Sequence, residues 1–162
     1  MERTITKKQL QAIAKVCSKD TTRPALMRLA IQNGKLWATD GYIAVAYNLN
    51  ATTADFTIDP DKLKMKLAVM KPMHAMTVEE LEVLKDEDDY QYPNMDIVVK
   101  VDEEKPSNNI FVNPALLARA STAIVNPTEG ENWFKVATYD KSHRIILTNK
   151  NGDMAIIMGG NK

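Results

Sequence analysis

The pattern of apolar and polar residues along this chain predicts one order of elements twice. In each copy a short strand precedes an amphipathic helix, and three strands follow it. The first copy has these elements at residues 3–6, 7–19, 25–32, 35–40 and 42–49, and the second has them at residues 109–112, 113–125, 132–140, 143–150 and 154–159. Two βαβββ units in 162 residues predict one domain with internal pseudo-symmetry, formed by residues 1–50 and 108–162. We expect an α+β fold in which both helices cover one face of antiparallel sheets.

A glycine occupies an expected chain reversal in each copy. Asp40-Gly41 separates the last two strands of the first copy, and Asn151-Gly152 separates the last two strands of the second. Glycine adopts the positive φ that a two-residue hairpin turn requires. We therefore expect a tight two-residue hairpin at both places.

The two copies are joined by residues 51–107, whose pattern differs from theirs. A short strand at residues 56–58 precedes a helix over residues 60–70, which has proline at its first position. A methionine-rich stretch and an acidic run follow, and residues 79–89 hold seven acids and one lysine. We expect this run to be a solvated acidic loop, and a site for a divalent metal is the second interpretation. The pattern of residues 92–101 indicates a turn followed by a buried strand.

Charge is distributed unevenly, although 21 basic and 21 acidic residues cancel over the whole chain. The helix at residues 7–19 carries four lysines and no acid, and Leu10, Ile13 and Cys17 have the spacing of a core-facing stripe. One interpretation is a solvated amphipathic helix, and the other is a surface that faces DNA phosphates. The second interpretation also takes in basic residues that come after this helix in the sequence. The candidates for DNA contact are then Lys7, Lys8, Lys15, Lys19, Arg23, Arg28 and Arg119.

The sequence carries few features of an enzyme. It has no glycine-rich phosphate loop, no G-x-S-x-G motif and no C-x-x-C pair, and His74 and His143 are isolated. We therefore expect no catalytic residue, no metal and no cofactor. No apolar run approaches ~18 residues and the first residues lack the apolar core of a signal peptide, so we expect no membrane span. The lone Cys17 indicates a reducing compartment, which favours the cytoplasm.

Four stretches of the chain carry a family resemblance, namely KLWATDGYIAVAY, YQYPNMDIVV, IFVNPALLARASTAI and IILTNKNGDMAIIMG. The first is similar to the A-T-D-G-H-R-L-A signature of bacterial sliding clamps, the β subunit of the replicative DNA polymerase, and the second to their F-P-D-Y-x-x-V-I segment. The third resembles the strand and helix that open the second half of the clamp's last domain, and the fourth resembles the clamp's C-terminal strands. The resemblance implies a DNA-clamp-like fold with two helices on one face and two small sheets outside, in a shortened relative of the phage or mobile-element kind.

The resemblance also implies a site, because clamps bind short peptide tails of polymerases and repair proteins in a hydrophobic pocket. The counterparts of its walls are Thr39, Gly41, Tyr42, Ile43, Ala44, Pro93, Ile97, Val98, Asn113, Leu116, Ile145, Ile156 and Met158. Tyr42 and Ile43 replace the family's His-Arg pair, and residues 158–162 replace its M-P-M-R-L end, so an apolar lip is missing. The other interpretation is that these residues are ordinary core positions of the sheet.

Together these features predict a DNA-replication accessory protein of the processivity-clamp kind. It would bind DNA independently of sequence and dock a DNA polymerase or another replication protein through a peptide tail, with several copies forming a homo-oligomeric ring if it encircles DNA. The first alternative is an interaction module without a ring that sequesters or scaffolds replication or transcription partners. The second is a small enzyme that uses the acidic run with a metal.

Overall fold

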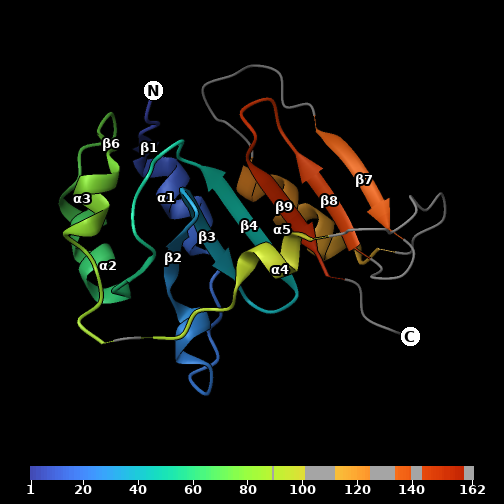
Figure 1. Ribbon diagram of the computed structural model, residues 1–162, viewed down its shortest axis with the longest axis horizontal. Helices are drawn as coiled ribbons and strands as arrows, with labels where there is room; N and C mark the ends of the chain where they lie inside the picture. Colours follow the sequence, from blue (N-terminus) through green and yellow to red (C-terminus); the bar gives the residue numbers. More distant parts are fainter. Residues whose placement is uncertain (89, 101–111, 125–133, 140–143, 159–162) are drawn as a thin grey trace.

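The computed structural model describes residues 1–88, 90–100, 112–124, 134–139 and 144–158. Its centre is a seven-stranded antiparallel sheet with the strand order β5-β2-β3-β4-β9-β8-β7 (Figure 1). These strands are β2 (Leu29–Gln32), β3 (Lys35–Thr39), β4 (Ile43–Asn48), β5 (Phe56–Ile58), β7 (Lys135–Tyr139), β8 (Arg144–Thr148) and β9 (Met154–Ile157). A second, two-stranded sheet pairs β1 (Ile5–Thr6) with β6 (Ala75–Met76).

Five α-helices and one 3-10 helix accompany the sheets in the described part of the chain. They are α1 (Lys7–Ala14), η1 (Pro24–Met27), α2 (Pro60–Val69), α3 (Val78–Glu82), α4 (Met95–Val99) and α5 (Pro114–Ile124). Polar caps determine where the first two long helices begin. The Thr6 side chain accepts from Gln9 N, and the Asp59 side chain accepts from the first free amides of α2. The predicted starts of these helices, at residues 7 and 60, are confirmed.

The two βαβββ units merge into one sheet instead of two small ones. β4 of the first unit pairs with β9 of the second, with Ile43 opposite Ile157. The strand order therefore runs β2-β3-β4 and then β9-β8-β7, so each unit contributes one half of the sheet about the β4–β9 pair. β5 from the connecting segment extends the sheet beside β2. The strand predicted at residues 109–112 lies outside the described residues except for Val112, which is not in a strand.

The two faces of the sheet are covered differently, because successive residues of a strand point to opposite faces. On one face, Ile43 and Tyr47 of β4 belong to the main core, which also includes buried residues of α1 and α5. On the other face, Ala44 and Ala46 pack in a smaller core with Met95 of α4. α1 and α5 also contact each other (Figure 1). The prediction that both helices lie on one face of the sheet is confirmed.

A buried ion pair joins the N-terminus to the last hairpin. Both Nη atoms of Arg3 donate to the carboxylate of Asp153, with Nη2 2.9 Å from Oδ2, and Asp153 is 1% exposed. The same carboxylate accepts from Asn48 N at 3.0 Å and from Asn149 Nδ2 at 3.1 Å. Because these partners come from the end of β4 and the turn before β9, the network fixes the first unit against the second.

The connecting segment contains two helices where the sequence pattern predicts other structure. The strand predicted within residues 92–101 is wrong, because Asn94 caps α4 by accepting from Asp96 N at 3.0 Å. A short apolar run is compatible with either element, so periodicity alone does not distinguish them. The acidic run is not all loop, because Thr77 and Glu80 form a capping box that begins α3. Asp89 of this run lies outside the described residues.

Two elements of the first unit are shorter than predicted. α1 ends at Ala14, so Lys15 and Lys19 follow the helix instead of lying on its surface stripe. The strand predicted from residue 25 begins only at Leu29, because the preceding residues form η1 with Pro24 at its first position. Proline has no N–H to donate to a strand ladder, which favours this boundary.

The two predicted hairpin turns differ in length. Gly41 and Gly152 have φ of 92° and 76°, the positive values expected of turn glycines. Asp40 N donates to Ile43 O at 3.3 Å, which leaves Gly41 and Tyr42 between the strands, whereas Asn149 N donates to Asp153 O at 3.0 Å and leaves three residues between them. A further two-residue turn is Asn33-Gly34 between β2 and β3, where φ is 49° and 68°. A Cβ atom on Gly34 would lie 2.3 Å from Ala51 O, so this position requires glycine for both its φ and its space.

Candidate peptide-binding and DNA-facing sites

The structure brings the stretches KLWATDGYIAVAY and IILTNKNGDMAIIMG together at one end of the sheet. Met158 N donates to Tyr42 O at 2.8 Å, which continues the ladder beyond the pairing of Ile43 with Ile157. The β3–β4 turn is fixed by Asp40, whose Oδ1 accepts from Tyr42 N at 2.8 Å and from Ile43 N at 3.0 Å. Two segments far apart in the sequence therefore meet beside this turn.

Helix α4 lies across the sheet next to this junction (Figure 1). Met95 is 1% exposed in the smaller core, and partly buried side chains packed against that core include Tyr92, Val98 and Met158. Arg144 at the start of β8 holds the end of α4, because its Nη1 donates to Val98 O at 2.7 Å and to Lys100 O at 3.1 Å. The stretch YQYPNMDIVV thus joins the same region from the connecting segment.

The start of α5 approaches the β3–β4 turn from the opposite face of the sheet. Asn113 Oδ1 accepts from Ala115 N at 2.9 Å, and Leu116 packs against the main core. Arg119 Nη2 lies 2.8 Å from Asp40 Oδ2, which ties α5 to the turn. All four stretches that the sequence analysis singled out therefore contact one end of the β4–β9 pair or the turn beside it.

The predicted pocket residues divide by exposure. Tyr42 and Ile97 are 66% and 67% exposed. The other exposed members are Gly41, Pro93 and Asn113, and the half-buried ones are Val98, Leu116 and Met158. The buried members are Thr39, Ile43, Ala44, Ile145 and Ile156. A peptide can reach the exposed and half-buried residues directly, whereas the buried residues are covered by other parts of the protein.

Successive residues of a strand face opposite sides of the sheet, so the buried pocket residues fall into two groups. Ile43 and Ile145 face the main core, whereas Ala44 and Ile156 face α4. Only the second pair lies beneath the accessible apolar side chains on the α4 face. We call this accessible set the α4 surface, and its residues are Tyr42, Pro93, Ile97, Val98 and Met158.

Two residues that shape the α4 surface were not among the predicted pocket residues. Tyr92 packs against the smaller core, and burial raises the pKa of its phenol. The sequence contains a signal for Tyr92, because this aromatic residue directly precedes Pro93, just as Phe precedes Pro in the F-P-D-Y segment of clamps. Arg144 orients α4 through the two carbonyl contacts described above. A single arginine at a strand start carries no comparable sequence signal.

The predicted DNA-contacting residues also divide into two groups. Three already have partners within the protein: Lys7 Nζ donates to Met70 O at 2.7 Å, Arg28 Nε lies 3.1 Å from Asp86 Oδ2, and Arg119 pairs with Asp40. Arg28 also stacks on the Tyr90 ring, with its Cζ 3.5 Å from the centroid. Besides Arg119, the exposed cations of the set are Lys8, Lys15, Lys19 and Arg23, and Arg23 Nε lies 4.0 Å from Asp20 Oδ2.

A groove of about 320 Å³ separates α1 from α5 on the helix-covered face. Its apolar lining comes from Ala12, Val16, Ala118 and Ala123, and Lys15, Arg119 and Thr122 also line it. Small side chains at these positions allow the two helices to approach each other. The exposed positive charge of the helix face is therefore concentrated on α1 and the residues just after it, and Lys15 borders the groove.

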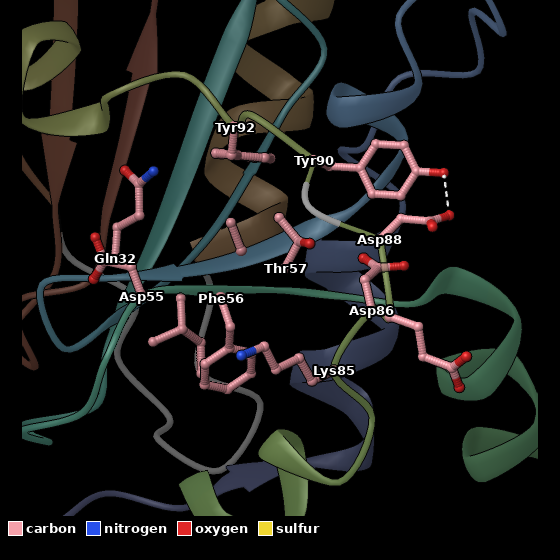
Figure 2. A pocket seen from close by; sticks show the side chains of 12 residues that line it. Gln32, Asp55, Phe56, Thr57, Lys85, Asp86, Asp88, Tyr90 and Tyr92 are labelled. Carbon is pink, nitrogen blue, oxygen red and sulfur yellow. Dashed lines mark hydrogen bonds between the residues drawn. The ribbon is translucent and has the colours of Figure 1, made fainter.

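A pocket of about 350 Å³ lies away from both regions, between β2, β5 and residues 85–92 (Figure 2). Several of its polar side chains have partners within the protein. Tyr90 Oη donates to Asp88 Oδ2 at 3.3 Å, and Gln32 donates to Pro93 O at 3.1 Å and accepts from Met95 N at 3.0 Å. This pocket marks where the connecting segment is attached to the sheet.

Three further features concern the chemistry and location considered for this chain. Among the described residues, no three His, Cys, Asp or Glu side chains come together in a way that could hold a metal ion. In the described part of the chain, no helix has the length and apolar character needed to cross a membrane. Burial raises the pKa of the Cys17 thiol to about 12, so this cysteine is protonated at neutral pH.

Comparison with solved structures identifies the fold as that of DNA sliding clamps. Over its whole length the chain is similar to a protein assigned as a DNA polymerase III beta subunit from Eubacterium rectale ATCC 33656, with a TM-score of 0.63 and 9% identity. It is also similar to the DNA polymerase sliding clamp from Bacillus subtilis, with a TM-score of 0.51 and 13% identity. The chain spans 66% and 64% of those two chains. No protein-family model matches the chain, and neither does any curated protein.

Proposed function

We propose that this protein is a clamp-like accessory factor of DNA replication that docks a DNA polymerase or another replication protein through a short peptide tail. The observation that supports this proposal is the α4 surface. Within a clamp-like fold, stretches that resemble clamp motifs meet at the end of the β4–β9 pair and leave Tyr42, Ile97 and Met158 accessible. The proposed role is binding and not catalysis, in a shortened relative of the clamps that acts in the cytoplasm.

The chemistry of the α4 surface favours a peptide with apolar side chains. Aliphatic and aromatic groups removed from water on binding contribute about 25 cal/mol per Å² before the costs of association. Because these costs are large, a short peptide should bind at roughly micromolar strength or weaker. The resemblance to sliding clamps adds a second preference, because the peptide tails that clamps usually bind combine an acidic or polar residue with Leu or Phe.

An NMR titration tests this proposal. A peptide that combines an acidic or polar residue with Leu and Phe is added to isotope-labelled protein, and a peptide of scrambled sequence is the control. We expect concentration-dependent shifts at Tyr42, Ile97 and Met158. Shifts that avoid these residues, or no shifts at about millimolar peptide, would show that the α4 surface does not bind such tails.

DNA is the second proposed partner, contacted through Lys8, Lys15, Lys19 and Arg23 on the helix-covered face. Binding that neutralises phosphates should be independent of sequence and should weaken steeply as salt is added. The test is the triple variant Lys8→Glu, Lys15→Glu and Lys19→Glu, in which we expect loss of DNA binding at low salt. The matched control changes the exposed Lys85, Lys135 and Lys150 to Glu, with the same change in net charge. Equal DNA binding by both variants would contradict this assignment.

A specific observation favours the alternative that this protein acts without a ring. Edge-to-edge pairing of sheets would need open strands at both edges of a subunit. The outer edge of β5 is already engaged, because Ile58 bridges to Lys85 and Asp86 N donates to Thr57 O at 3.0 Å. A second candidate function is therefore an interaction module that binds clamp-directed peptides without encircling DNA. Light scattering with and without DNA distinguishes the two, because a ring of such domains must contain several copies.

A further inference from the structure

The β3–β4 turn connects the α4 surface to helix α5 on the opposite face of the sheet. Asp40 Oδ1 accepts from Tyr42 N at 2.8 Å and from Ile43 N at 3.0 Å, which fixes the turn that carries Tyr42. The other carboxylate oxygen, Oδ2, lies 2.8 Å from Arg119 Nη2. One carboxylate therefore holds both the exposed aromatic residue of the α4 surface and a cation of α5.

A second cation lies against the same turn. A Cβ atom built on Gly41 would lie 3.4 Å from Arg23 Nη1, so the Arg23 guanidinium group is next to the turn. Arg23 is exposed, and its 4.0 Å approach to Asp20 is at the outer limit of an ion pair. Both guanidinium groups at this turn thus belong to residues predicted to contact DNA.

The Arg119 side chain is open to solvent on the helix-covered face. It is 45% exposed, whereas the side chain of Asp40 is 13% exposed. Arg119 also lines the groove between α1 and α5 together with the exposed Lys15. A guanidinium group binds phosphate oxygens with the same paired geometry that it uses for a carboxylate. A phosphate that enters this groove is therefore a chemical competitor of Asp40.

We propose that a DNA phosphate competes with Asp40 for Arg119, so that DNA and the peptide tail weaken each other's binding. This inference rests on the proposed function, because it links the two ligands named there. When Arg119 binds a phosphate, the turn loses its ion pair with α5, and Asp40 is left with the amides of Tyr42 and Ile43. A less ordered turn binds a peptide more weakly, since the peptide must then order it.

The coupling is reciprocal and small. A ligand that lowers the affinity for a second ligand has its own affinity lowered by the same factor. One partly exposed ion pair is exchanged for a contact with phosphate, so we expect a factor of about three to ten.

Isothermal titration calorimetry of the full chain at low salt measures this factor. The peptide is the acidic, Leu- and Phe-containing one, and the DNA is a short duplex of mixed sequence. We expect the peptide Kd to rise about three- to tenfold at saturating DNA, and the DNA Kd to rise by the same factor at saturating peptide. In Arg119→Met, which removes the guanidinium group, the peptide Kd should already be raised without DNA, and DNA should change it by less than about twofold.

Lys15→Met is the matched control, because it removes one positive charge from the same groove and leaves the ion pair of Arg119 with Asp40 in place. It should weaken DNA binding but change neither the peptide Kd without DNA nor the coupling factor at saturating DNA. Direct repulsion between an acidic peptide and DNA is also distinguished, since such repulsion would persist in Arg119→Met.

A second variant and a second measurement do not depend on Arg119→Met. Asp40→Asn keeps an oxygen that accepts from Tyr42 N and Ile43 N, but it lacks the charge that pairs with Arg119. We expect it to bind DNA at least about threefold more tightly than Asp61→Asn, which makes the same change of charge at an exposed acid of α2. Hydrogen exchange of the Tyr42 and Ile43 amides should become faster when DNA is added.

The outcomes separate this inference from the proposed function. Circular dichroism first verifies that every variant is folded. If the peptide or the DNA alone fails to bind the wild-type protein, the proposed function is wrong and the inference with it. If both bind and the peptide Kd is the same with and without DNA, only the inference is overturned. Coupling that persists undiminished in Arg119→Met also overturns it, because repulsion between the two ligands then accounts for the effect.

Discussion

Replacement of Tyr42 by Ala tests the largest accessible side chain of the α4 surface. A tyrosine buries about 150–250 Å² when it is fully enclosed, and 66% of the Tyr42 surface is exposed in the free protein. Roughly 100–160 Å² is therefore available for a peptide to cover, which at about 25 cal/mol per Å² corresponds to about 2.5–4 kcal/mol. This free energy is an upper bound, because the ring loses freedom on binding and the peptide does not cover it completely.

We therefore expect Tyr42→Ala to weaken peptide binding by about 1–2 kcal/mol, which is about a 5- to 30-fold rise in Kd. Isothermal titration calorimetry with the acidic, Leu/Phe-containing peptide measures this change. The unfolding temperature should stay within about 2 °C of the wild type, because the side chain projects from a turn into solvent. Val136→Ala is the matched control, since Val136 is 59% exposed on β7 and should leave Kd unchanged. A Kd for Tyr42→Ala within twofold of the wild type would refute the argument.

Four further outcomes are expected. Met158→Asp should reduce peptide affinity by at least tenfold in the same titration, because a carboxylate would be introduced beside Ala44 and Ile156. Asp153→Ala should lower the free energy of unfolding by about 3–5 kcal/mol in urea denaturation, since Arg3 and the amide of Asn48 lose a buried partner. Gly34→Ala should cost at least about 1–2 kcal/mol in the same assay, whereas Asn33→Gly should cost less than about 1 kcal/mol, because only the first places a Cβ against Ala51 O. Iodoacetamide should modify Cys17 slowly at pH 8 to 10 in folded protein and rapidly in urea. The folded pKa of about 12 exceeds the unfolded value of 9.0, so this contribution to stability is complete below pH 9 and is lost as the pH rises towards 12.

Local sequence signals account for the elements that were predicted correctly. Helices α2 and α5 begin where a cap and a proline in the first turn occur together, and most strands of both units coincide with short apolar runs. The capping box of Thr77 and Glu80 was an equally local signal for α3, but the high density of acids favoured a loop. The strand predicted within residues 92–101 is wrong because its apolar run is too short to distinguish a strand from a helix, so the Asn94 cap and the packing of Met95 decided in favour of a helix.

The sequence indicated which stretches form the candidate site, but it did not indicate which of their residues a ligand can reach. The order of the four stretches indicated which residues would meet, and the hydrogen bond from Met158 N to Tyr42 O shows that two of them do. Which of those residues a ligand can reach depends on alternation within paired strands, which turns Ile43 to the main core and Ala44 to α4. The partners of Lys7, Arg28 and Arg119 lie tens of residues away along the chain, so no local pattern reveals that these cations are engaged.

The sequence by itself determined the order of one helix followed by three strands in both copies, the starts of the long helices and the stretches that meet at the end of the β4–β9 pair. These depend on capping groups, on proline and on apolar spacing, which act between neighbours along the chain. The tertiary structure alone decided that the two units share one sheet, because that choice is the pairing of β4 with β9. It also decided which of the predicted pocket residues face solvent and which of the predicted DNA-contacting residues have partners within the protein. Burial and ion pairing are set by contacts between distant segments, and those contacts exist only after the chain has folded.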